Sequence, residues 1–490
     1  MSDTRLVGQR ETLMSGTSDE PDGRGTTGPQ RRSTWARVLP WTLALVFAGL
    51  YATISVARFE RLASWSLDLG IFEQAIRHYA HLQAPIVDLE GVDHNFLGDH
   101  WSPAIAVFAP FYRLFPTPVT LLVGQAVVIA LAVVPITRAG MRHLGRWSGV
   151  AVGLAFGMSY GIQTAVDFDV HEVCLAVPLL AFALEALLAR RWTAVAAWAA
   201  PLVLVKEDLG LTVAALGLVL VLIGARRWGL GLAAFGLTSF ALTVAVLIPH
   251  FAAAGGSSRL SELSSQSGEG DSLLHRILSL PLNVVQSEPK AITVLLLLAV
   301  TAGLVLRSPL AIMVLPTLGW RFLSTNQHHW GQSFHYDLVL MPIVFAALID
   351  GVVRVRRGRW QPLPGYVRAA PTLALLVGLI LSSRTAFADL VNPATYQPSP
   401  RAQAAERILS RIPDGAIVET DLRLLAQLTN RTRVFLVGNT GPVIPEFVLI
   451  SLTDTGQAGD PAKYAEVLHP GTTYALVLVE DDCSLVRRIP

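Results

Sequence analysis

The chain has 490 residues, of which 52% are hydrophobic and only 15% are charged, and its mean hydropathy is +0.49. Soluble domains carry about 25% charged residues, so this composition excludes an ordinary water-soluble protein and predicts a polytopic membrane protein. The net charge of +2 is too small to indicate a nucleic-acid partner. The two cysteines, Cys174 and Cys483, fit no zinc motif and predict no disulfide.

The N-terminal residues 1–36 are rich in Gly, Ser, Thr, Asp and Arg and lack apolar periodicity, which is typical of a disordered tail. The tail is too long and too polar for a cleavable signal peptide. We therefore expect the apolar run at 38–54 to be an uncleaved signal-anchor.

Eleven apolar segments are candidate transmembrane helices. They are 38–56, 119–138, 148–165, 172–190, 193–206, 209–224, 229–249, 291–306, 309–324, 337–353 and 369–387. Several are shorter than the roughly 20 residues that a straight helix needs to cross the hydrocarbon core. The pattern of a membrane span is weakest over 193–224. The sequence predicts an all-α polytopic fold, with its transmembrane domain at 37–390.

Clustered arginines predict the orientation of these segments. They fall at every second connection: Arg31, Arg32 and Arg37; Arg138, Arg142 and Arg146; Arg190 and Arg191; Arg226 and Arg227; Arg307; then Arg354, Arg356, Arg357 and Arg359. Positive residues mark cytoplasmic loops, so we expect a multi-pass plasma-membrane protein with a cytoplasmic N-terminus. An odd number of spans places the C-terminal segment outside.

The opposite loops carry acids, histidines, tryptophans and amides. They are 57–118, 166–171, 206–208, 250–290 and 325–336. Long, chemically varied loops are where function concentrates, so we expect the functional site on the outer face. The loop at 250–290 is rich in Gly and Ser and is predicted to be a flexible outer loop or a lid.

The first outer loop, 57–118, holds two candidate groups. After Asp68 an apolar periodicity predicts an amphipathic surface helix with Glu73 on it, and Asp68 is either its N-cap or a functional acid. His100 follows as a metal or substrate ligand, or as a solvated loop residue. Ser102 and a following proline begin a short apolar helix, 103–114, which we expect to be re-entrant or interfacial.

The later outer loops hold further candidates. Asp167, Asp169 and His171 form either a solvated turn or a site for a divalent cation such as Mg²⁺ or Mn²⁺. Lys206 either neutralises Glu207 or holds a phosphate.

One arginine and two aromatic side chains complete the set. Arg321 lies within a predicted span, where an arginine is either functional or reaches to the interface. His335 and Tyr336 open the next helix, where a donor can face the outer side.

The C-terminal segment, 398–490, changes character. Strand-like runs at 416–419, 433–437, 447–452 and 474–479 alternate with helical patterns, which predicts a small α/β domain on the outer face. It carries no glycine fingerprint or nucleophile motif, so we interpret it as a lid or recognition module.

Four stretches resemble an uncharacterised family of bacterial polytopic membrane proteins, known as a domain of unknown function. They are LDLGIFEQ at 67–74, HWSP at 100–103 with FAPFY at 108–112, KED at 206–208 and HY at 335–336. The resemblance spans about 57 to 480. This family is in turn similar to the GT-C membrane glycosyltransferases in its cytoplasmic N-terminus, its acid after span one, its surface helix and its roughly 11 spans.

The resemblance implies transfer of a sugar from a polyprenyl-phosphate donor to an envelope or lipid acceptor, with inversion. It implies that Asp68 is the general base, and less directly that Asp167 and Asp169 match a second acidic loop. The substrate-binding candidates are Lys206, Arg321, His335, Tyr336, His100 and Glu73, and the metal candidates are Asp167, Asp169 and His171. The alternatives are a transporter or flippase of lipid-linked sugar and a non-catalytic envelope scaffold; the oligomeric state is left open.

Overall fold

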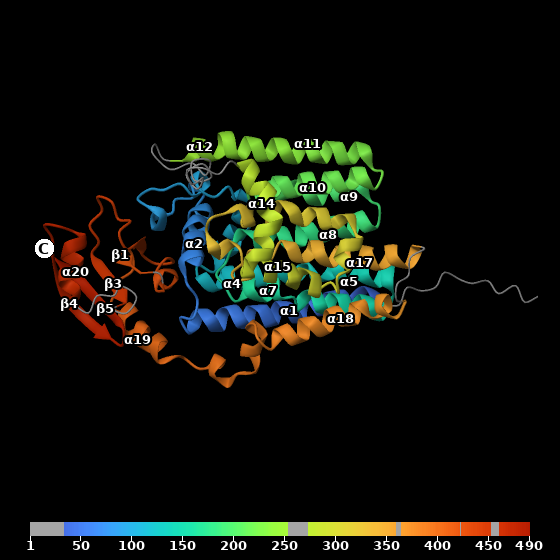
Figure 1. The fold of residues 1–490 in the computed structure, drawn as a ribbon. Helices are drawn as coiled ribbons and strands as arrows, with labels where there is room; N and C mark the ends of the chain where they lie inside the picture. The colour runs from blue at the N-terminus through green and yellow to red at the C-terminus, as the bar shows by residue number, and fades with distance from the viewer. Residues whose placement is uncertain (1–33, 253–272, 359–363, 422, 452–459) are drawn as a thin grey trace, which may run out of the picture.

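The computed structural model describes residues 34–252, 273–358, 364–421, 423–451 and 460–490. The predicted disordered tail therefore lies almost wholly outside the described residues, as does the middle of the 250–290 loop. Within these ranges a helical bundle forms one end of the molecule and a small sheet domain forms the other (Figure 1).

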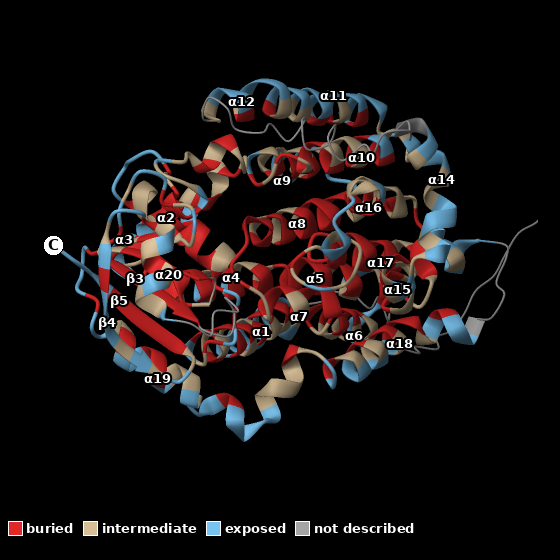
Figure 2. Cartoon of the chain, turned by 60° about the vertical axis from the view of Figure 1, so that its left-hand side comes forward, coloured by how far each residue is buried: buried red, intermediate tan, exposed pale blue. Residues whose placement is uncertain are grey.

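The bundle contains every segment that was predicted to span the membrane. Its helices are α1 Thr34–Glu60, α4 Pro118–Leu131, α5 Val133–Leu144, α6 Arg146–Gly157, α7 Tyr160–Val166, α8 Ala176–Leu188, α9 Trp192–Ala199, α10 Leu209–Leu222, α11 Arg226–Leu242, α12 Ile248–Phe251, α14 Leu273–Gln286, α15 Glu288–Ala299, α16 Leu315–Leu323, α17 Leu340–Arg357 and α18 Pro364–Ser382. Buried residues form the middle of the bundle, while exposed residues gather on α11 and α14 (Figure 2).

Fewer helices than eleven are long enough to cross a membrane alone. In the described residues five are long and apolar enough: Trp35–Glu60, Pro118–Leu144, Arg146–Val166, Arg226–Phe251 and Gly365–Ser382. A sixth is formed if the pair His275–Gln286 and Glu288–Ala299, bent by 80°, counts as one span. The structure confirms a polytopic helical fold but not the count of eleven spans, because several predicted spans are short helices packed inside the bundle.

Local sequence explains where several helices begin. Thr117 accepts a hydrogen bond from the Val119 amide and Pro118 follows it, which is a favourable start for α4. Helix α6 begins after Gly145, whose φ of 95° turns the chain. The predicted short helix at 103–114 is present as a 3₁₀ segment, Pro103–Phe108, followed by α3, Ala109–Leu114.

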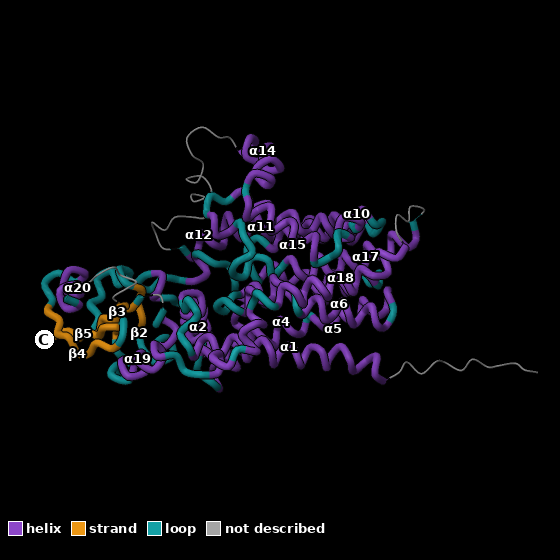
Figure 3. The backbone as a smooth tube through the Cα atoms, turned by 60° about the horizontal axis from the view of Figure 1, so that its bottom comes forward, coloured by secondary structure: helices purple, strands orange, loops and turns teal. Residues whose placement is uncertain are grey.

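The C-terminal segment forms the predicted α/β domain (Figure 3). Its elements are α19 Pro400–Leu409, β1 Ile417–Thr420, β2 Arg433–Leu436, β3 Phe447–Ser451, α20 Pro461–Leu468, β4 Thr473–Glu480 and β5 Cys483–Ile489. The strand order is β2-β1-β3-β5-β4. β1 is parallel to β2 and β3, whereas β5 is antiparallel to β3 and β4. β5 was not predicted.

Helix α2, Leu67–Ala80, lies between the bundle and the sheet domain (Figure 1). The sequence predicted an amphipathic helix on the membrane surface, but the run Leu69–Ile76 is buried without interruption. The C-terminal domain covers the face that would otherwise meet water. Helix α2 is therefore an internal element that joins the two parts of the molecule.

Candidate functional site

Four loops meet at the end of the bundle that faces the C-terminal domain. They carry the Asp68 cluster, defined as Asp68, His171, Glu172, Lys206 and His335. Ligand atoms of Asp68, His171 and His335 all lie within 4.8 Å of one another. His171 Nδ1 lies 2.6 Å from Glu172 Oε2, and Lys206 Nζ lies 2.5 Å from Glu172 Oε1. The fold thus gathers polar residues that are far apart in the sequence.

Asp68 lies in the first turn of α2 and is not its N-cap. The cap position is Ser66, which has a φ of 65° and makes no side-chain cap hydrogen bond. Burial raises the pKa of Asp68 to about 7, with a further rise from Asp169, while the positive charge of Lys206 opposes the rise. A carboxyl group that titrates near neutral pH is suited to act as a general base.

The side chain of Asp169 lies near the start of α2, apart from that of Asp167. Asp169 is 1% exposed, and burial raises its pKa to about 6, while the amides of Ser66, Asp68 and Leu69 lower it by their attraction to the carboxylate. It therefore sits against the N-terminus of α2, where a negative charge is favourable.

Asp167 has another partner. Its Oδ1 lies 2.9 Å from Arg58 Nη1, and its side chain is 37% exposed. The expected group Asp167, Asp169 and His171 is therefore divided among three environments, and only His171 lies in the Asp68 cluster.

Glu172 links His171 to Lys206. Burial by itself would raise the pKa of Glu172, but the nearby His171 and Lys206 hold it well below its usual range. Lys206, expected to neutralise Glu207 or hold a phosphate, contacts Glu172 in the structure. Glu172 was not a predicted site residue, and its place directly after His171 at the start of an apolar segment was the available signal.

The two imidazoles of the cluster are stacked. The rings of His171 and His335 have centroids 3.3 Å apart and planes 23° apart. Burial lowers the pKa of His171 to about 4 and lowers the pKa of His335 well below its usual range. Both rings are therefore neutral at pH 7, which permits their close contact.

Arg321 organises the loop that carries His335 and Tyr336. It is fully buried, its Nη1 lies 2.5 Å from Asp337 Oδ1, and it donates to the carbonyls of His329 at 2.8 Å and Gly331 at 2.7 Å. Most of its donors are thus used inside the loop. Its predicted role as a substrate ligand stays a prediction.

Glu73 and His100 occupy different places. Glu73 is buried on another face of α2, where it accepts hydrogen bonds from Tyr112 at 2.8 Å and from Thr429 of the C-terminal domain. His100 lies beside Asp99 at 3.1 Å, and its charge acts on the carboxyl of Asp68. His100 is therefore near the cluster, whereas Glu73 connects α2 to the C-terminal domain.

A small cavity lies on one side of the cluster. This cavity of about 20 Å³ is lined by residues that include Lys206, His335 and Tyr336, and it has room for about one water molecule.

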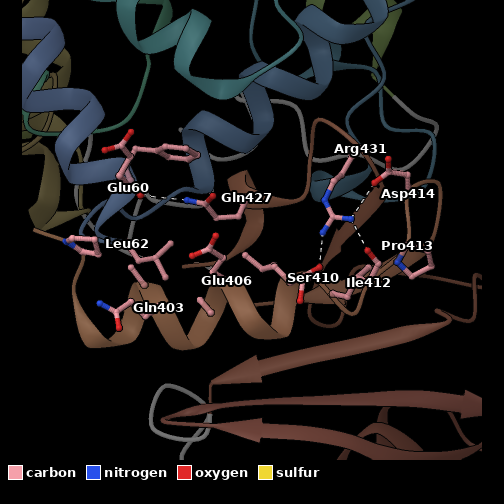
Figure 4. A pocket seen from close by; sticks show the side chains of 15 residues that line it. Glu60, Leu62, Gln403, Glu406, Ser410, Ile412, Pro413, Asp414, Gln427 and Arg431 are labelled. Carbon is pink, nitrogen blue, oxygen red and sulfur yellow. Dashed lines mark hydrogen bonds and ion pairs between the residues drawn. The ribbon is translucent and has the colours of Figure 1, made fainter.

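A larger hollow of about 740 Å³ lies elsewhere, between the end of α1 and α19 (Figure 4). Its arginine, Arg431, donates to the carbonyls of Ile412 and Leu409 and pairs with Asp414. These contacts hold the domain together. The hollow contains no member of the Asp68 cluster.

The sequence identifies a family over most of the chain. Residues 58–463 match the family described as "Predicted membrane protein (DUF2079)". The chain belongs to this family. The match contains the whole Asp68 cluster and most of the C-terminal domain, so the DUF2079 region includes both sides of the interface around α2. No curated protein sequence matches the chain.

Two solved structures of ArnT from Cupriavidus metallidurans are similar to the chain. The structure bound to undecaprenyl phosphate is 14% identical, with a TM-score of 0.48, and the match covers 92% of this chain and 97% of that one. The structure in the apo state is 15% identical, with the same TM-score and coverage. At these values the similarity carries no information about the site.

Proposed function

We propose that this DUF2079 protein is a membrane glycosyltransferase that uses a polyprenyl-phosphate sugar and acts on the outer face of the plasma membrane. The observation that carries the proposal is the position of Asp68. Its carboxyl has a pKa of about 7 and lies at one end of an apolar bundle, beside two imidazoles and a lysine.

The orientation is part of the proposal. Helix α11 begins with Arg226 and Arg227, and α17 ends with Arg354, Arg356 and Arg357. These helix ends lie away from the C-terminal domain (Figure 1). Under the positive-inside rule they face the cytoplasm, and the Asp68 cluster and the C-terminal domain then face outward.

In the proposed reaction an acceptor hydroxyl attacks the anomeric carbon of the donor. The carboxylate of Asp68 takes the hydroxyl proton, a new C–O bond forms, and the bond between the anomeric carbon and the phosphate oxygen breaks. Polyprenyl phosphate leaves with the bonding electron pair, and the anomeric configuration is inverted. Positive charge near the cluster, from Lys206 and from His100 when protonated, stabilises the departing phosphate.

A divalent cation is part of the same proposal. Mg²⁺ or Mn²⁺ was expected at Asp167, Asp169 and His171, and such an ion supplies charge stabilisation to a phosphate leaving group. Of these three residues, only His171 lies in the Asp68 cluster, since Asp167 pairs with Arg58.

The test is Asp68→Asn, assayed in membranes against a panel of radiolabelled polyprenyl-phosphate sugars. Loss of the base should reduce transfer by at least about 100-fold, because general-base catalysis contributes about 10²–10⁴-fold. Asp93→Asn is the matched control, since Asp93 is an exposed acid of the same loop at positive φ, which asparagine tolerates. Transfer at the wild-type rate by Asp68→Asn would exclude the proposed role.

A further inference from the structure

The Asp68 cluster presents three ligands of a kind that binds metals. In the described residues, Asp68, His171 and His335 form the one group of at least three histidine, cysteine or acidic side chains whose ligand atoms lie within 4.8 Å of one another. The group combines one carboxylate with two imidazoles. It differs from the all-oxygen sets that Mg²⁺ and Ca²⁺ prefer.

The surroundings of His171 match those of a metal-bound histidine. Its Nδ1 lies 2.6 Å from Glu172 Oε2, and Lys206 holds the other oxygen of this carboxylate at 2.5 Å. His171 Nδ1 and Glu172 Oε2 are in contact without hydrogen-bond geometry, so the observation is one of charge and distance. A carboxylate beside one ring nitrogen favours the proton there and leaves the lone pair of the other nitrogen available to a metal. Glu172 therefore orients His171 without itself being a ligand.

His335 supplies an independent observation. Its side chain is more than nine-tenths buried, and among the described residues its Nδ1 has no hydrogen-bond partner. A buried polar atom without a partner costs free energy, and native proteins usually satisfy such atoms with a protein group, a water molecule or an ion. The cavity of about 20 Å³ beside His335 and Lys206 has room for about one water molecule.

We propose that Asp68, His171 and His335 bind one divalent transition-metal ion, and that Zn²⁺ is the best match. Two imidazoles and one carboxylate are a ligand set of catalytic zinc sites, in which the fourth position stays open to water or substrate. This set differs from the acidic loop that the sequence suggested. The proposal rests on the geometry of the cluster and does not depend on the sugar-transfer reaction. It is compatible with the base role of Asp68, because one carboxylate oxygen would bind the ion while the other stays available for a proton.

Metal binding requires a defined local change. The nitrogen lone pairs of two stacked imidazoles lie in nearly parallel planes. The lone pairs of zinc ligands must instead converge on the ion from different directions. One of the two rings must therefore rotate about its Cβ–Cγ bond. Bonds of about 2.0–2.1 Å also place neighbouring ligand atoms about 3.4 Å apart. The ion therefore replaces the stacking contact of His171 and His335 and draws Asp68 toward them.

The first experiment measures binding with no substrate present. The purified full-length protein in detergent is stripped with EDTA, dialysed separately against Zn²⁺, Co²⁺, Mn²⁺ or Mg²⁺, and analysed for bound metal. We expect one Zn²⁺ or Co²⁺ per chain, an intense visible Co²⁺ spectrum typical of four-coordinate sites, and no retained Mg²⁺. Absence of stoichiometric Zn²⁺ and Co²⁺ binding would overturn the proposal.

Variants assign the ion to the cluster. His171→Gln and His335→Gln should each weaken Zn²⁺ binding by at least 10-fold, and Glu172→Gln should weaken it by about 10–100-fold. His328→Gln is the matched control, because His328 is an exposed histidine of the same loop as His335. Unchanged affinity in both cluster histidine variants would place the ion elsewhere and overturn the assignment.

A variant that gains a spectroscopic signal separates loss of a metal ligand from misfolding of the protein. His335→Cys keeps a ligand at this position and should add a thiolate-to-Co²⁺ charge-transfer band in the near-ultraviolet. Its absence from a Co²⁺-loaded, monodisperse protein would contradict coordination at residue 335. Wild-type protein that binds Zn²⁺ but transfers no sugar would leave the metal site standing and reject the proposed function.

Discussion

At the scale of single residues, the surroundings of the cluster shift the pKa values of two neighbouring acids in opposite directions. Asp68 has a pKa near 7 because it is buried and close to the negative Asp169. Glu172 is more deeply buried than Asp68, but His171 and Lys206 hold its pKa well below the usual range. Environments that separate the pKa values of two acids usually separate their roles. Asp68 is thus the acid suited to proton transfer, and Glu172 is a fixed counter-ion.

Glu73 gives a prediction about pH and stability. Burial raises the pKa of Glu73 from 4.5 to about 7, so the folded protein favours its protonated form. Its contribution to stability is full below the unfolded pKa and is lost as pH rises through about 7. Relative to wild type, Glu73→Gln should therefore gain on the order of 1–3 kcal/mol between pH 5 and pH 8.

Thermal unfolding in detergent at several pH values measures this effect. Glu60→Gln is the control, because Glu60 is an exposed glutamate at the end of α1. A constant difference between wild type and Glu73→Gln across this pH range would contradict the predicted titration of Glu73.

At the scale of elements, helices α10 and α11 pack through glycines. A Cβ at Gly217 would lie 2.5 Å from the Ala233 amide nitrogen, and a Cβ at Gly229 would lie 2.6 Å from the Gly217 carbonyl oxygen. Gly210 and Gly236 make the same kind of contact, seven residues along each helix from Gly217 and Gly229. Small residues let helix backbones approach closely, which is how apolar helices associate where lipid offers no hydrophobic driving force.

Substitution of Gly229 should separate these helices. An exposed glycine in a helix gains about 0.5–1 kcal/mol when it becomes alanine, but Gly229→Ala places its methyl group against the backbone of α10. We expect Gly229→Ala to lower the unfolding temperature and Gly231→Ala, on the same helix with no atom within 4 Å of its Cβ, to maintain or raise it. Equal stability of the two variants would show that the close approach is not required.

At the scale of the whole molecule, the C-terminal domain holds α2 against the bundle. Gln74 donates to the Val434 carbonyl at 3.0 Å, and Arg77 donates to the Thr429 carbonyl at 2.9 Å. Arg433 forms two contacts with Asp88, at 2.7 and 2.9 Å. Since Asp68 lies in the first turn of α2, the domain also fixes the base of the proposed reaction. This gives the C-terminal domain a positioning role besides the predicted lid or recognition role.

Removal of Arg433 should loosen this interface. The pair with Asp88 is partly exposed, so Arg433→Ala should cost only about 1 kcal/mol. We expect faster hydrogen exchange of the α2 amides in this variant. Arg407→Ala is the control, because Arg407 pairs with Glu480 inside the C-terminal domain. Equal exchange in α2 for both variants would argue against a role for the domain in holding the helix.

The sequence by itself determined the class of the protein and most of its elements. Composition predicted a helical membrane protein, and each of the eleven apolar segments is helical in the structure. Four strand-like runs predicted the C-terminal α/β domain. Strand β5 was not predicted, because Arg487 and Arg488 interrupt its apolar pattern. These features are local, since hydrophobic runs and strand propensity act over about ten residues.

Only the tertiary structure decided which polar groups meet. Asp167 pairs with Arg58, Lys206 contacts Glu172, and His171 stacks on His335. None of these pairs is visible in the spacing of the chain, because each joins loops that come together only when the bundle packs. The same packing places Asp68 among these groups and raises its pKa. The sequence could therefore name Asp68, but the site around it exists only in the folded protein.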